Sequence, residues 1–131
     1  MQKNYNEWSR QKEILDKRGL KDKRVYPKER EVWVCSVGIN IGFEQNGNNK
    51  SFERPVLVFK KFNNRMVWGI PLTSKQKKID FYCNFTDPNG QEVSAIIAQM
   101  RLFSINRFDR KMYLLPEDTF MDIKHQFLRL I

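Results

Sequence analysis

Residues 54–74 read Arg-Pro-Val-Leu-Val-Phe-Lys-Lys-Phe-Asn-Asn-Arg-Met-Val-Trp-Gly-Ile-Pro-Leu-Thr-Ser, and this stretch decides the fold class. Two runs rich in β-branched and aromatic residues, 55–62 and 65–71, flank the pair Asn63-Asn64. Such residues favour strands, and an Asn pair can adopt the positive φ that a two-residue hairpin turn needs. The stretch therefore predicts a β-hairpin.

Short apolar runs of the same kind continue on both sides of this hairpin. They predict further strands over 31–37, 79–86, 91–97 and 110–114. The sequence Asp87-Pro88-Asn89-Gly90 predicts a four-residue turn between two of them. Six short strands indicate an antiparallel sheet, and closure into a small β-barrel would remove its exposed edges.

Helical patterns occur at the two ends of the sequence. Pro116-Glu117-Asp118 suits a helix N-terminus, and apolar residues follow it at helical spacing up to Leu130. Residues 1–30 carry ten Lys and Arg against five Asp and Glu, and the pattern within them predicts an amphipathic helix over 5–18 and a linker over 20–28. The expected organisation is a basic N-terminal helical extension, 1–30, and a barrel domain, 31–131.

Composition limits the class of protein. A chain of 131 residues with 40% hydrophobic residues suits one folded core and excludes wholesale disorder. A net charge of +9 favours polyanionic partners such as nucleic acid. The apolar runs are too short for a signal peptide or a membrane span, so we expect a cytoplasmic protein that does not bind membranes.

Few residues are available for metal binding or for imidazole chemistry. The chain has one histidine and two cysteines 48 positions apart, which predicts that it binds no metal or other cofactor. Cys35 and Cys83 lie within strand patterns and are expected to be buried, reduced thiols. His125 is expected to be a partly exposed helix residue, and Gly38, Gly42 and Gly47 lack the helix that a phosphate-binding loop requires.

Polar residues at strand ends remain as candidates for chemistry. Arg54 directly precedes an apolar run, so its planar guanidinium projects from a rigid support and suits a phosphate. Thr73 and Ser74 end the next strand, and their hydroxyls could donate to phosphate oxygens. Plainer interpretations also fit, namely a surface salt bridge of Arg54 with Glu53 or Glu31 and an ordinary turn at Thr73-Ser74.

Five motifs, in order, resemble the MazF/PemK family of toxin endoribonucleases from bacterial type II toxin–antitoxin systems. The motifs are Glu31-Val32-Trp33-Val34, Gly42-Phe43-Glu44-Gln45, Arg54-Pro55-Val56-Leu57-Val58, Pro71-Leu72-Thr73-Ser74 and Gln99-Met100-Arg101. The resemblance covers about 31–131. It implies an SH3-like barrel with a C-terminal helix, to which this chain adds an N-terminal helix.

The resemblance also implies a function. A member of this family is a homodimer that cuts single-stranded messenger RNA without a metal ion, pairs with an antitoxin protein, and meets DNA only through the antitoxin complex. Arg54 matches the catalytic arginine of the family, and Thr73 its catalytic hydroxyl, with Ser74 beside it. RNA-binding positions are expected at Phe43, Glu44, Gln45, Lys75, Lys77, Lys78, Gln99 and Arg101.

Departures from the family pattern leave several points open. The loop from Asn46 to Glu53 is longer than usual, and Ala98 stands where many members have an acidic residue. Glu44 is then either the general base or a carboxylate that orders its loop, and Phe43 either stacks on a base or packs beneath the loop.

Other functions also fit this pattern. A non-catalytic RNA-binding module is one, and a gyrase-targeting toxin of the CcdB type, which shares the barrel, is another, although the chain lacks the Trp-Gly-Ile ending of such toxins. The basic segment 1–30 could line the RNA path, extend the dimer or cap the barrel.

Overall fold

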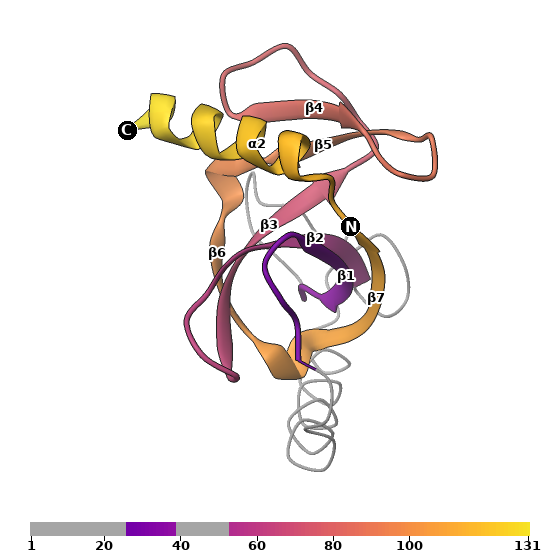
Figure 1. Ribbon diagram of the computed structural model, residues 1–131, viewed down its shortest axis with the longest axis vertical. Helices are drawn as coiled ribbons and strands as arrows, with labels where there is room; N and C mark the ends of the chain where they lie inside the picture. The colour runs from indigo at the N-terminus through magenta and orange to yellow at the C-terminus, as the bar shows by residue number, and fades with distance from the viewer. Residues whose placement is uncertain (1–25, 39–52) are drawn as a thin grey trace, which may run out of the picture.

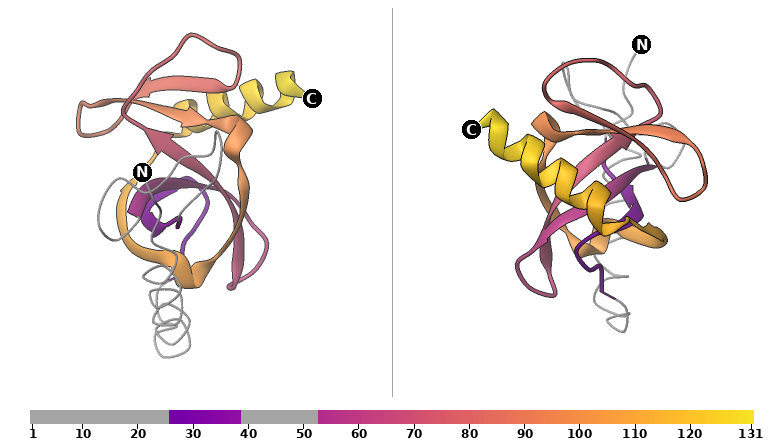
Figure 2. Two further views of the ribbon diagram at one scale, coloured as in Figure 1. Left: turned by 180° about the vertical axis from the view of Figure 1, so that it is seen from behind. Right: turned by 45° about the horizontal axis from the view of Figure 1, so that its top comes forward.

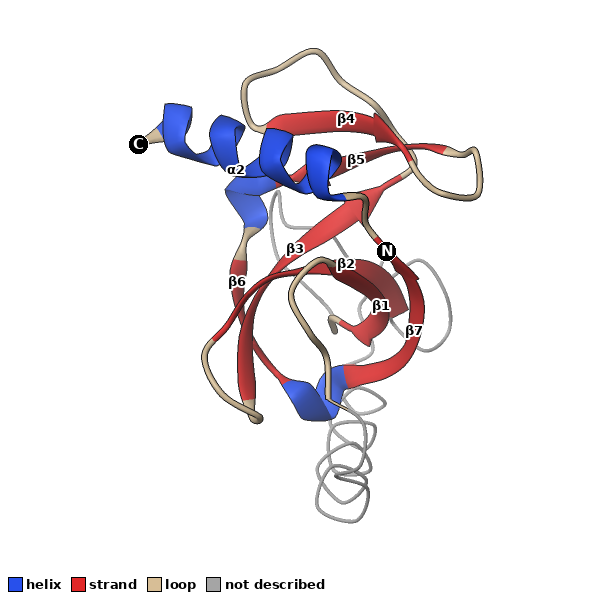
Figure 3. Cartoon of the chain, in the orientation of Figure 1, coloured by secondary structure: helices blue, strands red, loops and turns tan. Residues whose placement is uncertain are grey.

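Seven strands and a C-terminal helix make up the part of the chain that the structure, a computed structural model, describes, which is residues 26–38 and 53–131 (Figure 1, Figure 3). The strands are β1 (Glu31–Ser36), β2 (Glu53–Lys61), β3 (Met66–Thr73), β4 (Tyr82–Thr86), β5 (Glu92–Ile96), β6 (Arg101–Ser104) and β7 (Phe108–Leu114). Short 3-10 turns, η1 (Ile97–Gln99) and η2 (Ile105–Arg107), precede β6 and β7, and the helix is α2 (Glu117–Leu130). The helix predicted over 5–18 lies outside the described residues.

All neighbouring strands of the sheet are antiparallel, in the order β4-β5-β3-β2-β1-β7, with β6 paired to β3. The long strand β3 has two partners along one side. Its residues Met66–Gly69 pair with β6, and Leu72–Thr73 pair with β5. In Figure 1, β3 accordingly joins the β4–β5 hairpin to the strands around β1 and β2.

The prediction of a closed barrel was wrong for the described strands. The path of pairing ends at β4 on one side and at β7 on the other, and no pairing within the described part joins these ends. Edge strand β7 carries Asp109, Arg110 and Lys111, and charged side chains disfavour pairing with another strand. The exposed edge is therefore protected without closure.

Successive side chains of a strand point to opposite faces of the sheet, and the buried ones form two clusters. The helix-side cluster includes Leu57, Ile70 and Cys83, together with Phe120 and Ile123 from α2, which lies across this face of the sheet (Figure 2). The strand-side cluster consists of Trp33, Cys35, Val37, Val56, Val58, Val67, Phe103 and Phe108. Register shifts in the β1–β7 and β2–β3 pairs bend the sheet around this second cluster.

The close approach of strands in the strand-side cluster requires glycine at position 69. A Cβ atom built there would lie 2.6 Å from Val56 Cγ1 and 2.7 Å from Phe103 Cδ2. Contacts this short are not tolerated in a packed core. Gly69 thus leaves room for the side chains of Val56 and Phe103, from the two strands paired with this part of β3, to pack over it.

The β2–β3 connection differs from the two-residue turn predicted at Asn63-Asn64. The residues from Phe62 to Arg65 form the turn, and Phe62 N–H donates to Met66 O at 3.2 Å. The Asn63 side chain accepts hydrogen bonds from the Arg65 and Met66 amides at 2.7 and 3.0 Å. Because a side-chain oxygen organises the turn, neither Asn adopts positive φ.

The other turn and the helix agree with the sequence. Asp87 accepts the amides of Asn89 and Gln91, each at 2.9 Å, and Gly90 has φ 83°, where glycine is favoured. The helix begins at Glu117, one residue after Pro116. Strand β6 was missed, because only four residues form it and one of them, Leu102, is 53% exposed.

Cys35, Cys83 and His125 have the environments that the sequence predicts. Cys35 and Cys83 are both buried and free, as predicted. His125 is exposed on α2. Within the described residues, no helix has the length and apolar character needed to cross a lipid bilayer.

Candidate functional site

Arg54 lies near the start of β2, and only 5% of it is exposed. Its Nη1 donates a hydrogen bond to the carbonyl oxygen of Leu72 in β3 at 3.2 Å. The guanidinium is therefore held against the neighbouring strand, and the predicted alternative of a surface salt bridge with Glu31 does not occur. Glu31 instead pairs with Lys111, with 3.0 Å between Oε2 and Nζ.

Thr73 directly follows Leu72, whose carbonyl oxygen accepts the hydrogen bond from Arg54. Val56 in β2 pairs with Pro71 in β3, and extending this register by two residues sets Arg54 opposite Thr73. Residues opposite each other in an antiparallel pair point to the same face of the sheet. Thr73 is 8% exposed, and its Oγ1 accepts the Lys75 amide at 3.2 Å, so the hydroxyl proton remains able to donate elsewhere.

A row of polar residues continues from Thr73 toward the edge of the sheet. Thr73 pairs with Ser94 in β5, and Ser94 pairs with Asn84 in β4. Ser94 is fully buried, and its Oγ has no hydrogen-bond partner within the described part of the chain. A buried hydroxyl without a hydrogen-bond partner lowers the stability of the fold, so a serine is unexpected at position 94, beside Thr73.

The lysines predicted to bind RNA lie in the loop that follows β3. Ser74, Lys75, Lys77 and Lys78 are all exposed. Gln76 fixes this loop, since its Nε2 donates to Val93 O at 2.9 Å and to Phe85 O at 3.4 Å. The loop therefore carries its lysines on a defined backbone.

Two further arginines lie at the end of β1. Arg101 Nη2 donates to Val37 O at 2.8 Å, and Arg107 Nη1 donates to Ser36 O at 3.3 Å. Cys35, the β1 residue paired with Arg54, precedes these carbonyls. Two guanidinium groups thus lie at the end of β1, beside the strand that carries Arg54, and such groups suit phosphate oxygens.

Burial and neighbouring charge shift the pKa values of the groups around this strand end. Burial lowers the pKa of the Arg54 guanidinium, and the nearby Tyr82 opposes that shift. Burial raises the pKa of the Cys35 thiol far above its usual value, against the effect of Arg107 and Arg101. Cys35 is therefore held as a neutral thiol and is unsuited to act as a nucleophile.

The structure brings together only some of the residues predicted from the sequence. Arg54, Thr73 and Arg101 share one side of the sheet, whereas Gln99 is half-buried in η1 and Lys77 and Lys78 lie toward the edge strand β4. Phe43, Glu44 and Gln45 lie outside the described residues.

Sequence reasoning missed Arg107 and Ser94. Arg107 fell in a segment read as a loop, because the last strand was predicted to begin at 110 rather than at Phe108. Ser94 lay within a predicted strand and gave no sign of chemistry. Strand pairing brings both residues toward the candidate site, and a single sequence does not show which strands pair.

Comparisons with known proteins agree with this architecture. A family model described as "PemK-like, MazF-like toxin of type II toxin-antitoxin system" matches residues 28–131. No curated protein has a significantly similar sequence.

Several solved structures have a similar fold. MazF (Form-I) from Deinococcus radiodurans has a TM-score of 0.62 at 18% identity, over 81% of this chain and 96% of that one. An endoribonuclease from Mycobacterial species, in complex with its cognate antitoxin, has a TM-score of 0.60 at 13% identity, over 79% and 92%. The toxin MazF-mt6 of Mycobacterium tuberculosis has a TM-score of 0.59 at 10% identity, over 76% and 94%. At these identities the likeness concerns the fold.

Proposed function

The chain belongs to the PemK-like, MazF-like toxins of type II toxin–antitoxin systems, and we propose that it acts there as an endoribonuclease that cuts single-stranded RNA without a metal ion. One observation carries the proposal. The Arg54 guanidinium donates a hydrogen bond to the carbonyl of Leu72, the residue before Thr73, and Arg54 and Thr73 are both more than nine-tenths buried.

The reaction is a transesterification followed by release of the products. The ribose 2′-oxygen attacks the adjacent phosphorus and loses its proton to a base, while the bond from phosphorus to the 5′-oxygen breaks. The leaving 5′-oxygen takes up a proton, which gives a 2′,3′-cyclic phosphate and a 5′-hydroxyl. Arg54 and Thr73 are the proposed catalytic residues, with Ser74 beside them at the mouth of the loop.

The role of these two side chains is electrostatic. Negative charge increases on the phosphoryl oxygens as the 2′-oxygen attacks, and donors fixed before the reaction stabilise it without reorganisation. The hydrogen bond from Nη1 to the Leu72 carbonyl fixes the orientation of the guanidinium, whose planar set of donors matches the oxygens of a phosphate. Because the site is largely shielded from water, these hydrogen bonds are stronger than they would be at the surface.

Partners follow from the same proposal. The structural neighbour from Mycobacterial species is in complex with its cognate antitoxin. We accordingly assign this chain an antitoxin partner, a homodimeric state, and action on messenger RNA in the cytoplasm, with contact to DNA only through the antitoxin complex.

The test compares four proteins on long single-stranded RNA in the presence of a chelator. We expect wild type to leave 2′,3′-cyclic phosphate and 5′-hydroxyl ends, and Arg54→Ala to lower the rate at least about 10³-fold, because it removes donors to the developing charge. Thr73→Val keeps the shape of the side chain and is expected to lower the rate about 10²-fold.

Arg110→Ala is the control, since this arginine lies on exposed β7 with 66% of its side chain exposed and pairs with Asp109. It should cut RNA at the wild-type rate. Circular dichroism melting identifies any variant that fails to fold. If Arg54→Ala does not fold, Thr73→Val still tests the proposal. Equal cutting by wild type and a folded Arg54→Ala protein would refute the mechanism.

A further inference from the structure

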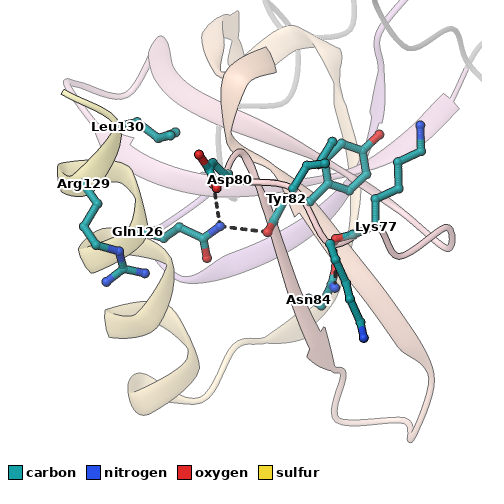
Figure 4. A pocket seen from close by; sticks show the side chains of 9 residues that line it. Lys77, Asp80, Tyr82, Asn84, Gln126, Arg129 and Leu130 are labelled. Carbon is teal, nitrogen blue, oxygen red and sulfur yellow. Dashed lines mark hydrogen bonds between the residues drawn. The ribbon is translucent and has the colours of Figure 1, made fainter.

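A hollow of about 490 Å³ lies at edge strand β4, between the loop after β3 and the C-terminal part of α2 (Figure 4). Cavities of this volume are common for small organic ligands. Side chains from three segments of the chain line it, namely Lys77, Lys78, Ile79, Asp80, Tyr82, Asn84, Gln126, Arg129 and Leu130.

The charge of this pocket favours an anion. Three of its side chains, Lys77, Lys78 and Arg129, are cationic, and one, Asp80, is anionic. Within residues 26–38 and 53–131, none of these cations forms an ion pair with a carboxylate. Uncompensated cations around a cavity attract phosphate groups.

Hydrogen bonds fix the walls of the pocket. Gln126 Nε2 on α2 donates to Asp80 O at 2.7 Å and to Tyr82 O at 2.8 Å, as Figure 4 shows. Asn84 Nδ2 donates to Lys77 O at 3.1 Å. Helix, loop and strand are thereby joined before any ligand arrives, and a ligand that binds has little ordering cost to overcome.

Asn84 supplies the means to recognise a base. Its side chain is exposed and uses one N–H on the Lys77 carbonyl, which leaves the second N–H and the Oδ1 atom for a ligand. A paired donor and acceptor matches the edge of an unpaired nucleobase.

The pocket lies close to the proposed catalytic residues. Asn84 is two strands away from Thr73, along the paired positions Asn84, Ser94 and Thr73. Strands are spaced by about 4.8 Å, so the two residues lie about 10 Å apart. Lys77 follows Thr73 by four residues, which limits the distance between their Cα atoms to about 14 Å.

We propose that this pocket binds a nucleotide of the RNA that flanks the reacting phosphate. Lys78 and Arg129 hold its backbone phosphate, and Asn84 hydrogen-bonds to the edge of its base. The proposal rests on the proposed function for the identity of the ligand, and it adds α2 and β4 to the RNA-binding surface.

The test measures binding separately from cutting. The probe is a fluorescent single-stranded RNA with 2′-O-methyl riboses, which lack the attacking hydroxyl and are not cut. For the double variant Lys78→Gln/Arg129→Gln we expect about tenfold weaker binding by anisotropy. The slope of log affinity against log salt concentration should fall by about 1.4, since each phosphate contact on a single strand contributes about 0.7.

The matched control, Lys60→Gln/Arg65→Gln, removes two cations near the β2–β3 turn, away from the pocket. It should bind nearly as wild type does. For Asn84→Ala we expect an altered distribution of cut sites on long RNA, because the donor and the acceptor that would read the base edge are removed.

Two outcomes would overturn the proposal. In the first, the pocket variants bind the methylated RNA as the control does and Asn84→Ala keeps the wild-type cut sites. In the second, the pocket variants alter the molecular mass in solution and not the salt slope, which would make this surface an interface between copies. Failure of the proposed function looks different, because wild type would then bind methylated RNA through the pocket but leave ordinary RNA uncut.

Discussion

At the scale of single residues, Glu31 shows how a buried carboxylate stabilises the start of β1. Its Oε1 accepts hydrogen bonds from the Lys28 amide at 2.8 Å and from Trp33 Nε1 at 3.0 Å, and its Oε2 pairs with Lys111. Burial by itself would raise the pKa of Glu31, but these hydrogen bonds and the charge of Lys111 lower it below its usual 4.5.

A lowered pKa gives a definite pH dependence. The ionised carboxylate stabilises the fold above pH 4.5, and this stabilisation is lost as the pH falls below that value and through the folded-state pKa. Glu31→Gln should therefore unfold in less urea than wild type near pH 7, and the difference in unfolding free energy should shrink in acid. Glu92→Gln, which changes an exposed carboxylate in β5, is the control. A difference that grows in acid would contradict the assignment.

Some residues of the candidate site could be predicted from the sequence, and others could not. Arg54 and Thr73 could be proposed from the sequence because each adjoins an apolar strand pattern. Tyr82, Asn84 and Arg129 were not, because they come together only where β4 meets the end of α2. Their types are common on any surface, so the sequence alone offers no reason to select them.

At the scale of elements, the β2–β3 turn depends on one side chain. Asn63 Oδ1 accepts two backbone amides, whereas Asn64 is exposed and its side chain makes no hydrogen bond within the described chain. Asn63→Ala should lower the free energy of unfolding by about 1 to 2 kcal/mol, because both amides lose their partner. Asn64→Ala should change it by less than about 0.5 kcal/mol.

Urea denaturation followed by tryptophan fluorescence measures both variants. Equal effects of the two substitutions would contradict the role given to Asn63.

Strand content was predictable at this scale, but strand pairing was not. The runs 55–62 and 65–71 correspond closely to β2 and β3, because their apolar residues face cores on both sides of the sheet. Strand β3 pairs first with β6 and then with β5, and nothing in the sequence around β3 indicates this change of partner. Closure was predicted because it would remove exposed edges, whereas among the described strands the path of pairing ends at β4 and at β7.

At the scale of the whole molecule, charge is distributed unevenly along the sequence. Residues 1–30 have ten basic and five acidic residues, and the remaining 101 residues have fourteen and ten. We expect the basic segment to add to RNA affinity. Replacing Lys12, Lys17, Lys21 and Lys23 by Gln should weaken binding of single-stranded RNA and lower the salt slope by about 0.7 for each lysine that contacts a phosphate.

The same measurement on Lys60→Gln/Arg65→Gln gives the effect of losing charge elsewhere. A salt slope equal to that of wild type would show that the N-terminal lysines do not contact RNA, and would favour a role of the segment in the dimer or in capping the fold.

The division of the core into two clusters leaves one sulfhydryl on each side of the sheet. Cys35 belongs to the strand-side cluster and Cys83 to the helix-side cluster, and burial raises the pKa of both thiols. Alkylating reagents attack the thiolate, so neither sulfur reacts until its own layer opens. The order in which iodoacetamide modifies the two cysteine-containing peptides consequently reports whether α2 leaves the sheet before the bent strands come apart.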